Sequence, residues 1–173
     1  MKRLTLAAIS LFACAAVQAT SKDVEMHVVT GEGIGAAAGH VTISETPEGL
    51  MFTPQLKGLP EGEHGFHVHA KGSCESTTVD GKTVAAGAAG GHFDPANTGK
   101  HLGPEGDGHL GDLPVLEVNA QGEATKAVTA PRIKKLSEIE GLALMVHAGG
   151  DNMSDHPKPL GGGGDRVVCG VIK

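Results

Sequence analysis

Histidines and acidic residues gather in the segment GGHFDPANTGKHLGPEGDGHLGD, residues 90–112. It holds His92, His101 and His109, ends on Asp112, and contains seven glycines. Three imidazole nitrogens and one carboxylate oxygen suit zinc, and glycines let the chain turn through positive φ and approach an ion closely. We therefore predict that these four residues close around a zinc ion, which would order a loop with little apolar surface of its own. The alternative is a solvated loop without metal.

A second candidate for chemistry is the pair of histidines in His67-Val68-His69. On a β-strand, residues two apart point to the same face and lie about 6.5–7 Å apart, so both rings can reach one metal ion. The spacing alone is weak evidence, but two histidines on an exposed strand face have no packing reason to be there. His147 ends the apolar run LALMVH, where a hydrogen-bonded core histidine and a metal ligand are both compatible with the pattern.

Short apolar or alternating runs must position these histidines. The runs, bounded by Gly, Pro, Asn and Asp, span residues 24–30, 40–46, 50–56, 65–69, 113–118, 124–130, 142–147 and 167–172. This pattern is typical of an all-β antiparallel sandwich or barrel. Only residues 133–140 are compatible with a short helix. Two long irregular segments, residues 71–112 and 148–165, interrupt the strands, and such loops are usually functional.

The first residues, MKRLTLAAISLFACAAVQA, have the pattern of an export signal. Lys2 and Arg3 precede an apolar run and a small-residue cleavage site. We predict a cleaved secretory signal peptide at residues 1–19 and one domain at residues 20–173. The alternative, a lipoprotein anchored at Cys14, is a poor match because of the neighbouring Phe12.

Charge and composition exclude several classes of partner. Cleavage removes Lys2 and Arg3 and no acid, so the formal net charge falls from -6 to -8. An acidic chain without a basic run is a poor nucleic-acid binder, and the absence of Trp and Tyr leaves few platforms on which bases could stack. After residue 19 no apolar stretch approaches the roughly 20 residues of a membrane helix. We therefore expect neither a nucleic-acid partner nor a membrane span.

Two cysteines, Cys74 and Cys169, remain after the predicted cleavage. An even cysteine count in an exported chain predicts a disulfide, with two free buried thiols as the alternative. The bond would close a long loop, which in the chain-entropy model stabilises the fold by about 4–5 kcal/mol at most.

Several ordered motifs resemble one known family. GFHVH, GGHFDP, GKHLGPEGDGHLGD, MVHAGGDNMSD and GGGGDRVVCGVIK are similar to segments of bacterial periplasmic copper/zinc superoxide dismutases, and the resemblance extends over nearly all of residues 20–173. It implies an eight-stranded antiparallel Greek-key β-barrel, with the active site outside the barrel beneath two long loops. It also implies a periplasmic enzyme, monomeric or homodimeric, that dismutates superoxide with one copper and one zinc per chain.

The resemblance also implies roles for individual residues. The copper ligands would be His67, His69, His92 and His147. The zinc ligands would be His92, His101, His109 and Asp112. His92 would therefore bridge the two metals and deliver a proton during the cycle.

Three further residues take expected roles from the same resemblance. Arg166 matches the arginine that guides the superoxide anion toward copper. Asp151 matches the aspartate that links ligand imidazoles of the two metal sites, and Asp155 is a rival for that role. His64 matches a structural histidine that does not bind metal.

Two other functions remain as alternatives. The same fold could carry or buffer copper and zinc in the periplasm, or it could be a structural β-sandwich whose loops bind zinc only. Family members that serve as carriers often lose copper ligands or the guiding arginine. Because this chain retains all four copper histidines and Arg166, the pattern favours catalysis.

Overall fold

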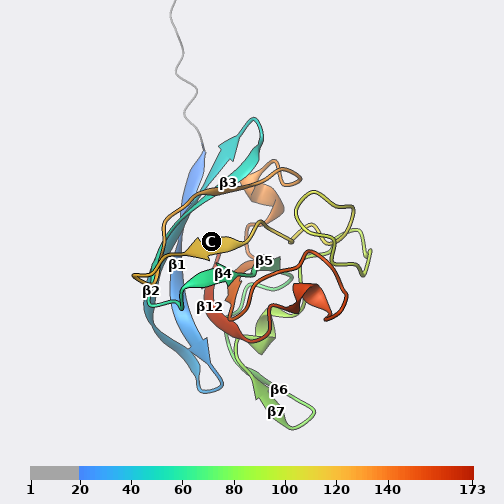
Figure 1. Ribbon diagram of the computed structural model, residues 1–173. Coiled ribbons are helices and arrows are strands. Elements are labelled where there is room, and N and C mark those ends of the chain that lie inside the picture. The colour runs from blue at the N-terminus through green and yellow to red at the C-terminus, as the bar shows by residue number, and fades with distance from the viewer. Residues whose placement is uncertain (1–19) are drawn as a thin grey trace, which may run out of the picture.

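Short strands joined by irregular loops make up residues 20–173, the part of the chain that the computed structural model describes (Figure 1). The strands are β1 Ser21–Thr30, β2 Gly33–Thr46, β3 Gly49–Lys57, β4 Gly62–His64, β5 Phe66–His69, β6 Thr77–Val79, β7 Lys82–Val84, β8 Leu116–Val118, β9 Glu123–Ala124, β10 Val128–Ala130, β11 Ala143–His147 and β12 Arg166–Val171. Single 3-10 turns are η1 Gly87–Ala89, η2 Leu136–Glu138 and η3 Leu160–Gly162. The predicted signal peptide and Cys14 lie outside the described residues. Within residues 20–173, no helix has the length and apolar character needed to cross a membrane.

One curled sheet forms the body of the molecule. It has eight antiparallel strands in the order β10-β3-β2-β1-β12-β11-β5, with β9 also paired to β3. The predicted all-β architecture is confirmed. In Figure 1 the sheet curls around the interior, and the loops coloured yellow and red lie together on one side of it, outside the strands.

The barrel core follows from the alternation of apolar residues along the strands. Registers pair Val24 with Val41 and Ile43 with Phe52, and each of these side chains is at most 1% exposed. The ring of Phe52 meets that of Phe66 edge to face, with centroids 5.6 Å apart. The core therefore extends to β5, and the residues that alternate with Phe66 point away from it.

Strand β5 carries the first pair of candidate ligands. Phe66 and Val68 face the core, while His67 and His69 face outward and are nonetheless buried, at 0% and 1% exposure. The cover is the long loop, whose Gly111 carbonyl accepts a hydrogen bond from the Val68 amide at 2.9 Å. A Cβ at Gly111 would lie 2.2 Å from the Val68 carbonyl oxygen, so this approach requires glycine.

The prediction that residues 71–112 are irregular throughout was wrong in one part. Strands β6 and β7 form a hairpin whose turn residues, Asp80 and Gly81, have φ of 49° and 76°. Positive φ at both turn positions is the geometry that Asp-Gly pairs favour in two-residue hairpins. The signal was present in the sequence TTVDGKTV, where Asp-Gly separates two short strand-forming runs.

The short helix with which residues 133–140 are compatible does not form, and the only regular element there is the single 3-10 turn η2. Ile133, Leu136 and Ile139 are all buried, and they are spaced by three. Leu136 lies in the turn and Ile139 directly follows it, whereas Ile133 precedes it, so all three reach the core without a regular helix. The Glu138 carboxylate accepts the amides that precede the turn and caps it.

Candidate metal centre

Two four-residue clusters of buried potential ligands lie side by side and share His92. The first, called the copper set below, is His67, His69, His92 and His147. The second, called the zinc set, is His92, His101, His109 and Asp112. In each set the candidate ligand atoms all lie within 4.8 Å of one another. The structure thus brings together the residues that the sequence analysis assigned to each metal.

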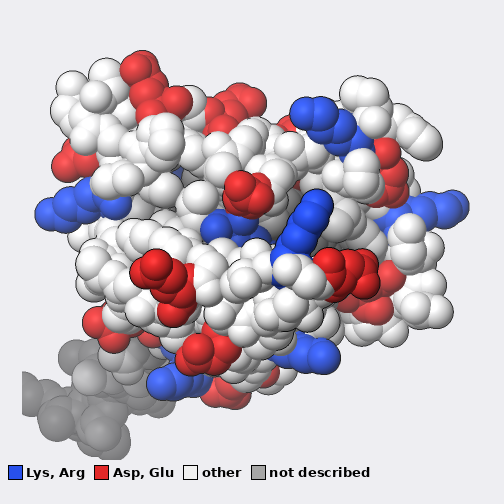
Figure 2. Space-filling view, turned by 90° about the horizontal axis from the view of Figure 1, so that it is seen from below, with Lys and Arg blue, Asp and Glu red and all other residues white. Residues whose placement is uncertain are grey.

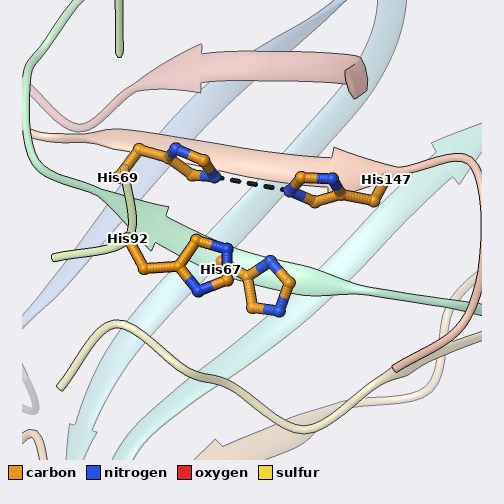
Figure 3. Close-up of side chains that lie close together, drawn as sticks. All are labelled: His67, His69, His92 and His147. Atoms are coloured by element: carbon orange, nitrogen blue, oxygen red, sulfur yellow. Dashed lines mark hydrogen bonds between the residues drawn. The ribbon is translucent and has the colours of Figure 1, made fainter. Parts of the chain in front are cut away.

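The copper set is positioned mainly by two adjacent strands. His67 and His69 project from β5, and His147 ends β11, which pairs with β5 so that Met145 lies opposite His67. Figure 3 shows the rings from these strands turned toward one another, with His92 reaching in from the long loop. Of the two interpretations left open for His147, the core histidine and the ligand, its position in this cluster favours the ligand.

The tautomers of two rings point to a cation between them. His69 donates from Nδ1 to the Gly90 carbonyl at 2.9 Å, and His147 donates from Nδ1 to the Gly164 carbonyl at 3.0 Å. In a neutral imidazole the other nitrogen then carries a lone pair. The two Nε2 atoms nevertheless face each other at 3.4 Å, along the dashed line in Figure 3. Two lone pairs at this distance repel, whereas a metal ion would bind both.

Four more ring nitrogens are buried without a hydrogen-bond partner among residues 20–173. They are Nδ1 of His67, Nε2 of His92, Nδ1 of His101 and Nδ1 of His109. An unpaired buried polar atom costs about 1–3 kcal/mol, so such a concentration requires an explanation. All four belong to the two ligand sets, and metal coordination would satisfy every one.

Distances within the zinc set suit tetrahedral coordination. The Asp112 Oδ1 atom lies 2.9 Å from Nδ1 of His92, 3.0 Å from Nδ1 of His101 and 3.4 Å from Nδ1 of His109. Ligand bonds of about 2.0–2.1 Å in a tetrahedron place neighbouring ligand atoms about 3.3–3.4 Å apart. The second carboxylate oxygen accepts the Leu102 amide at 3.2 Å, which orients Oδ1 toward the three rings.

The carboxylate that touches both sets is that of Asp151. Its Oδ2 accepts from Nε2 of His67 at 2.7 Å, and its Oδ1 accepts from Nε2 of His101 at 2.8 Å. Asp155, the rival, instead accepts the backbone amide of His101 at 2.9 Å. Gly161 closes over this link, because a Cβ there would lie 2.0 Å from the Asp151 carboxylate. Asp151 therefore leaves Nδ1 of each linked ring free to face its metal set.

Burial keeps the rings of the copper set neutral. Burial lowers the pKa of His67 to about 3, although the hydrogen bond to Asp151 acts in the opposite direction. Burial likewise lowers the pKa of His147 to about 4 and that of His69 well below its usual value. Since metals bind the neutral imidazole, these three rings need not lose a proton near neutral pH.

The zinc set has the opposite electrostatics. Burial alone would lower the pKa of His101, but the nearby carboxylates of Asp112 and Asp151 outweigh it and raise the pKa to about 9. Burial would raise the pKa of the Asp112 carboxyl, yet the adjacent rings of His101 and His92 hold that pKa well below its usual range. Without metal, the zinc set is therefore a cationic ring beside an ionised carboxylate.

Arg166 lies beside the copper set. Its guanidinium donates to the Ala86 carbonyl at 2.7 Å and to the Gly90 carbonyl at 2.6 Å. The Gly90 oxygen also accepts from His69, so one atom positions both the cation and a ring of the copper set. Figure 2 shows acidic and basic side chains interspersed over one face, with some basic atoms recessed near its centre.

A disulfide ties the long loop to the strand that carries Arg166. Cys74 and Cys169 are bonded across 95 residues, which confirms the predicted bond. Cys169 lies on β12, three residues after Arg166, and Cys74 precedes the loop carbonyls that Arg166 contacts. The bond therefore fixes the start of the segment that carries these acceptors to the strand that carries the arginine.

Three other residues complete the surroundings of the two sets. Both ring nitrogens of His64 are engaged with backbone carbonyls, at 2.7 and 2.9 Å, so this ring has no nitrogen free for a metal. Two groups were not predicted from the sequence: the carbonyl of Gly90, and the guanidinium of Arg132, which contacts the loop that carries the zinc set. Neither had a signal in the sequence, since a backbone acceptor has no side-chain pattern and a single arginine after a strand is common.

Comparisons with known proteins agree on one family. The family model described as copper/zinc superoxide dismutase matches residues 37–172. Superoxide dismutase [Cu-Zn] 2 of Salmonella typhimurium is 65% identical over 173 residues, 100% of both chains. The Cu/Zn superoxide dismutase from Brucella abortus superposes with a TM-score of 0.88 at 55% identity, covering 89% of this chain and 100% of that one. The monomeric copper, zinc superoxide dismutase from Salmonella enterica gives 0.81 at 65% identity, with the same coverage.

Proposed function

The chain belongs to the copper/zinc superoxide dismutase family, and we propose that its two ligand sets hold one copper and one zinc per chain. The activity is the dismutation of superoxide, in which two superoxide anions and two protons give oxygen and hydrogen peroxide. The fold is the family's eight-stranded Greek-key β-barrel. The observation that carries the assignment of ligands is the pair of sets sharing His92, with unpartnered ring nitrogens facing inward.

His92 is proposed to hold and deliver a proton as well as to join the two sets. When bound, copper supplies the one-electron redox chemistry, while zinc has none and adds positive charge. Nδ1 of His92 faces Asp112 in the zinc set, and its Nε2 faces the copper set. Burial lowers the pKa of His92, so a proton on Nε2 is readily given up to the peroxide product.

Arg166 is proposed to attract the superoxide anion. The guanidinium stays charged at all relevant pH values, and its two carbonyl acceptors hold it beside the copper set. In a chain of net charge -6, a partly buried cation focuses a small anion toward its position. A metal carrier on the same fold would not require such a cation, so Arg166 is the feature that favours dismutation over the carrier alternative.

Location, processing and assembly are also proposed. We infer that residues 1–19 are removed on export and that residues 20–173 act in the periplasm as one domain. The chain would be a monomer or a homodimer. The Salmonella enterica relative is described as monomeric. Sedimentation of the purified protein, together with N-terminal sequencing, tests these points.

Metal analysis of purified variants tests the assignment of ligands. We expect one copper and one zinc per chain in the wild type, with rapid superoxide consumption that cyanide inhibits. His147→Ala should lose copper and keep zinc, whereas His109→Ala should lose zinc and keep copper. His92→Ala should weaken both. His156→Ala provides the matched control, because His156 is exposed and belongs to neither set.

The same experiment separates the alternatives. Bound copper and zinc without superoxide consumption would favour a carrier. Zinc without copper would favour the structural sandwich. Loss of copper from His109→Ala and retention of copper by His147→Ala would contradict the proposed division of ligands.

A further inference from the structure

Arg132 is the one arginine among residues 20–173 that the proposed reaction does not use. It follows β10 by two residues and precedes Ile133, which is fully buried in the barrel core. Its partly buried guanidinium reaches across to the long loop. One terminal nitrogen donates to the His109 carbonyl at 3.1 Å, and the other donates to the Gly108 carbonyl at 2.9 Å. Arg132 thus joins the rigid barrel to the backbone of a residue in the zinc set.

The contact has the geometry of a positioning device. A planar guanidinium that donates to two successive carbonyls restrains their direction as well as their distance, which a single hydrogen bond does not. On the other side of the same residue, the His109 amide donates to the Lys100 carbonyl at 2.9 Å. The chain is close-packed here, since a Cβ at Gly108 would lie 2.3 Å from that carbonyl oxygen. The backbone of His109 is therefore held from both sides.

We propose that Arg132 is a positioning residue for the zinc set: its two hydrogen bonds hold the loop so that the ring of His109 faces Asp112 before zinc arrives. The proposal rests on the proposed zinc ligands. Arg132 contacts none of their ligand atoms, so it acts through the backbone alone. Its positive charge by itself opposes the binding of a divalent cation, so positioning and charge predict effects of opposite sign when the arginine is replaced.

Zinc affinity of variants tests the proposal. Metal-free wild type, Arg132→Gln and Arg132→Lys are titrated with zinc in competition with a chromophoric chelator. If positioning dominates, Arg132→Gln should bind zinc about 10- to 100-fold more weakly, the range typical for residues that orient metal ligands. Arg132→Lys keeps the charge and reaches one carbonyl, so its loss should be smaller. Lys134→Gln is the matched control, because Lys134 donates to an exposed barrel carbonyl near Arg132.

A spectroscopic readout separates positioning from general destabilisation. Cobalt(II) in the zinc set reports ligand geometry through its visible absorption, which we expect to shift in Arg132→Gln and to remain unchanged in Lys134→Gln. Zinc affinity that is unchanged or higher in Arg132→Gln would overturn the proposal. If Arg132→Gln does not fold, Arg132→Lys decides, and an affinity and a cobalt spectrum equal to those of the wild type would overturn it.

Failure of the zinc assignment itself gives a different result. In that case His109→Ala would bind zinc as tightly as the wild type, whatever the behaviour of the Arg132 variants. A weakened His109→Ala together with an unaffected Arg132→Gln would overturn the inference on Arg132 alone.

Discussion

The copper and zinc sets lie side by side and share His92, but the chain builds them by different means. Three copper-set rings project from β5 and β11, whose spacing is set by backbone hydrogen bonds within the sheet. The other three zinc-set residues, His101, His109 and Asp112, come from an irregular loop. That loop is held by side chains, among them Arg132 at His109 and Asp155 at His101.

Because of this difference, the copper set is largely formed by the sheet before metal binds, whereas the order of the zinc set depends on its metal. Hydrogen-bonded strands cost more free energy to open than an irregular loop, so the strand-borne rings of the copper set share more of the stability of the barrel. The loop buries little apolar surface, and much of its order must come from polar contacts and from zinc, whose binding energy becomes folding energy. The electrostatics follow the same division, with neutral rings on the strands and a paired ion, His101 with Asp112, in the loop.

The largest expected difference between the two sets is the effect of removing each metal on hydrogen exchange of the backbone. Without zinc, amides of residues 100–112 should exchange hydrogen faster by a factor on the order of 100, because local opening no longer breaks metal bonds. Without copper, amides of β5 and β11 should exchange at unchanged rates. Hydrogen exchange with mass spectrometry on the two forms measures both. Equal protection of residues 100–112 with and without zinc would break the contrast.

Arg166→Glu tests the proposed guiding role of Arg166, which belongs to neither ligand set. We expect kcat/KM for superoxide to fall about 10- to 100-fold at low salt, within the range of electrostatic steering, while both metals stay bound. Arg166→Lys keeps the charge and should lose less. Stopped-flow decay of superoxide across a salt series, with metal analysis of each variant, measures this. If kcat/KM of Arg166→Glu at low salt equals that of the wild type, Arg166 has no steering role.

The strand-borne part of the centre is also the part that could be predicted directly from residue spacing. His67 and His69 are two apart, and a strand period places both on one face. The alternation of Val41 with Ile43 likewise predicts the core-facing side of β2, which the structure confirms. The two-residue period of the sequence is sufficient to predict these side-chain directions, because side chains along a strand alternate with the same period.

Loop contacts could not be predicted in this way, because they join residues far apart in sequence without a period. The choice between Asp151 and Asp155 required the fold of both loops, since each carboxylate reaches His101 across at least 50 residues. Arg132 gave no signal at all. The hairpin at Asp80 and Gly81 was missed for a different reason, because its local Asp-Gly signal lay within a segment interpreted as irregular throughout.

The pH dependence of metal binding should differ between the sets by about one proton. His101, with a pKa of about 9, is protonated at pH 7 in the metal-free protein, so zinc must displace a proton from it. Zinc affinity should therefore rise about tenfold per pH unit between pH 6 and 8. His67 and His147, with pKa values of about 3 and 4, are already neutral over that range and should release none to copper. Titration calorimetry in buffers of different ionisation enthalpy counts the protons, and equal release by both metals would contradict the contrast.

The smallest expected effect on zinc affinity is that of Asp155→Asn. This variant tests whether the contacts of Asp155 and Arg132 act together on the loop that carries the zinc set. The Asp155 carboxylate accepts the amides of His101 and Leu160, so it joins the zinc loop to the second long loop. An asparagine oxygen can still accept one of these bonds, and the site is largely open to water, so zinc affinity should fall by less than about 10-fold. If Asp155 and Arg132 hold separate ends of one loop, the double variant with Arg132→Gln should lose more than the sum of the two free-energy losses, because each contact limits the movement that the other leaves possible. Strictly additive losses in the zinc titration would mean that the two contacts act on independent segments. The loop that carries the zinc set would then not move as one cooperative unit.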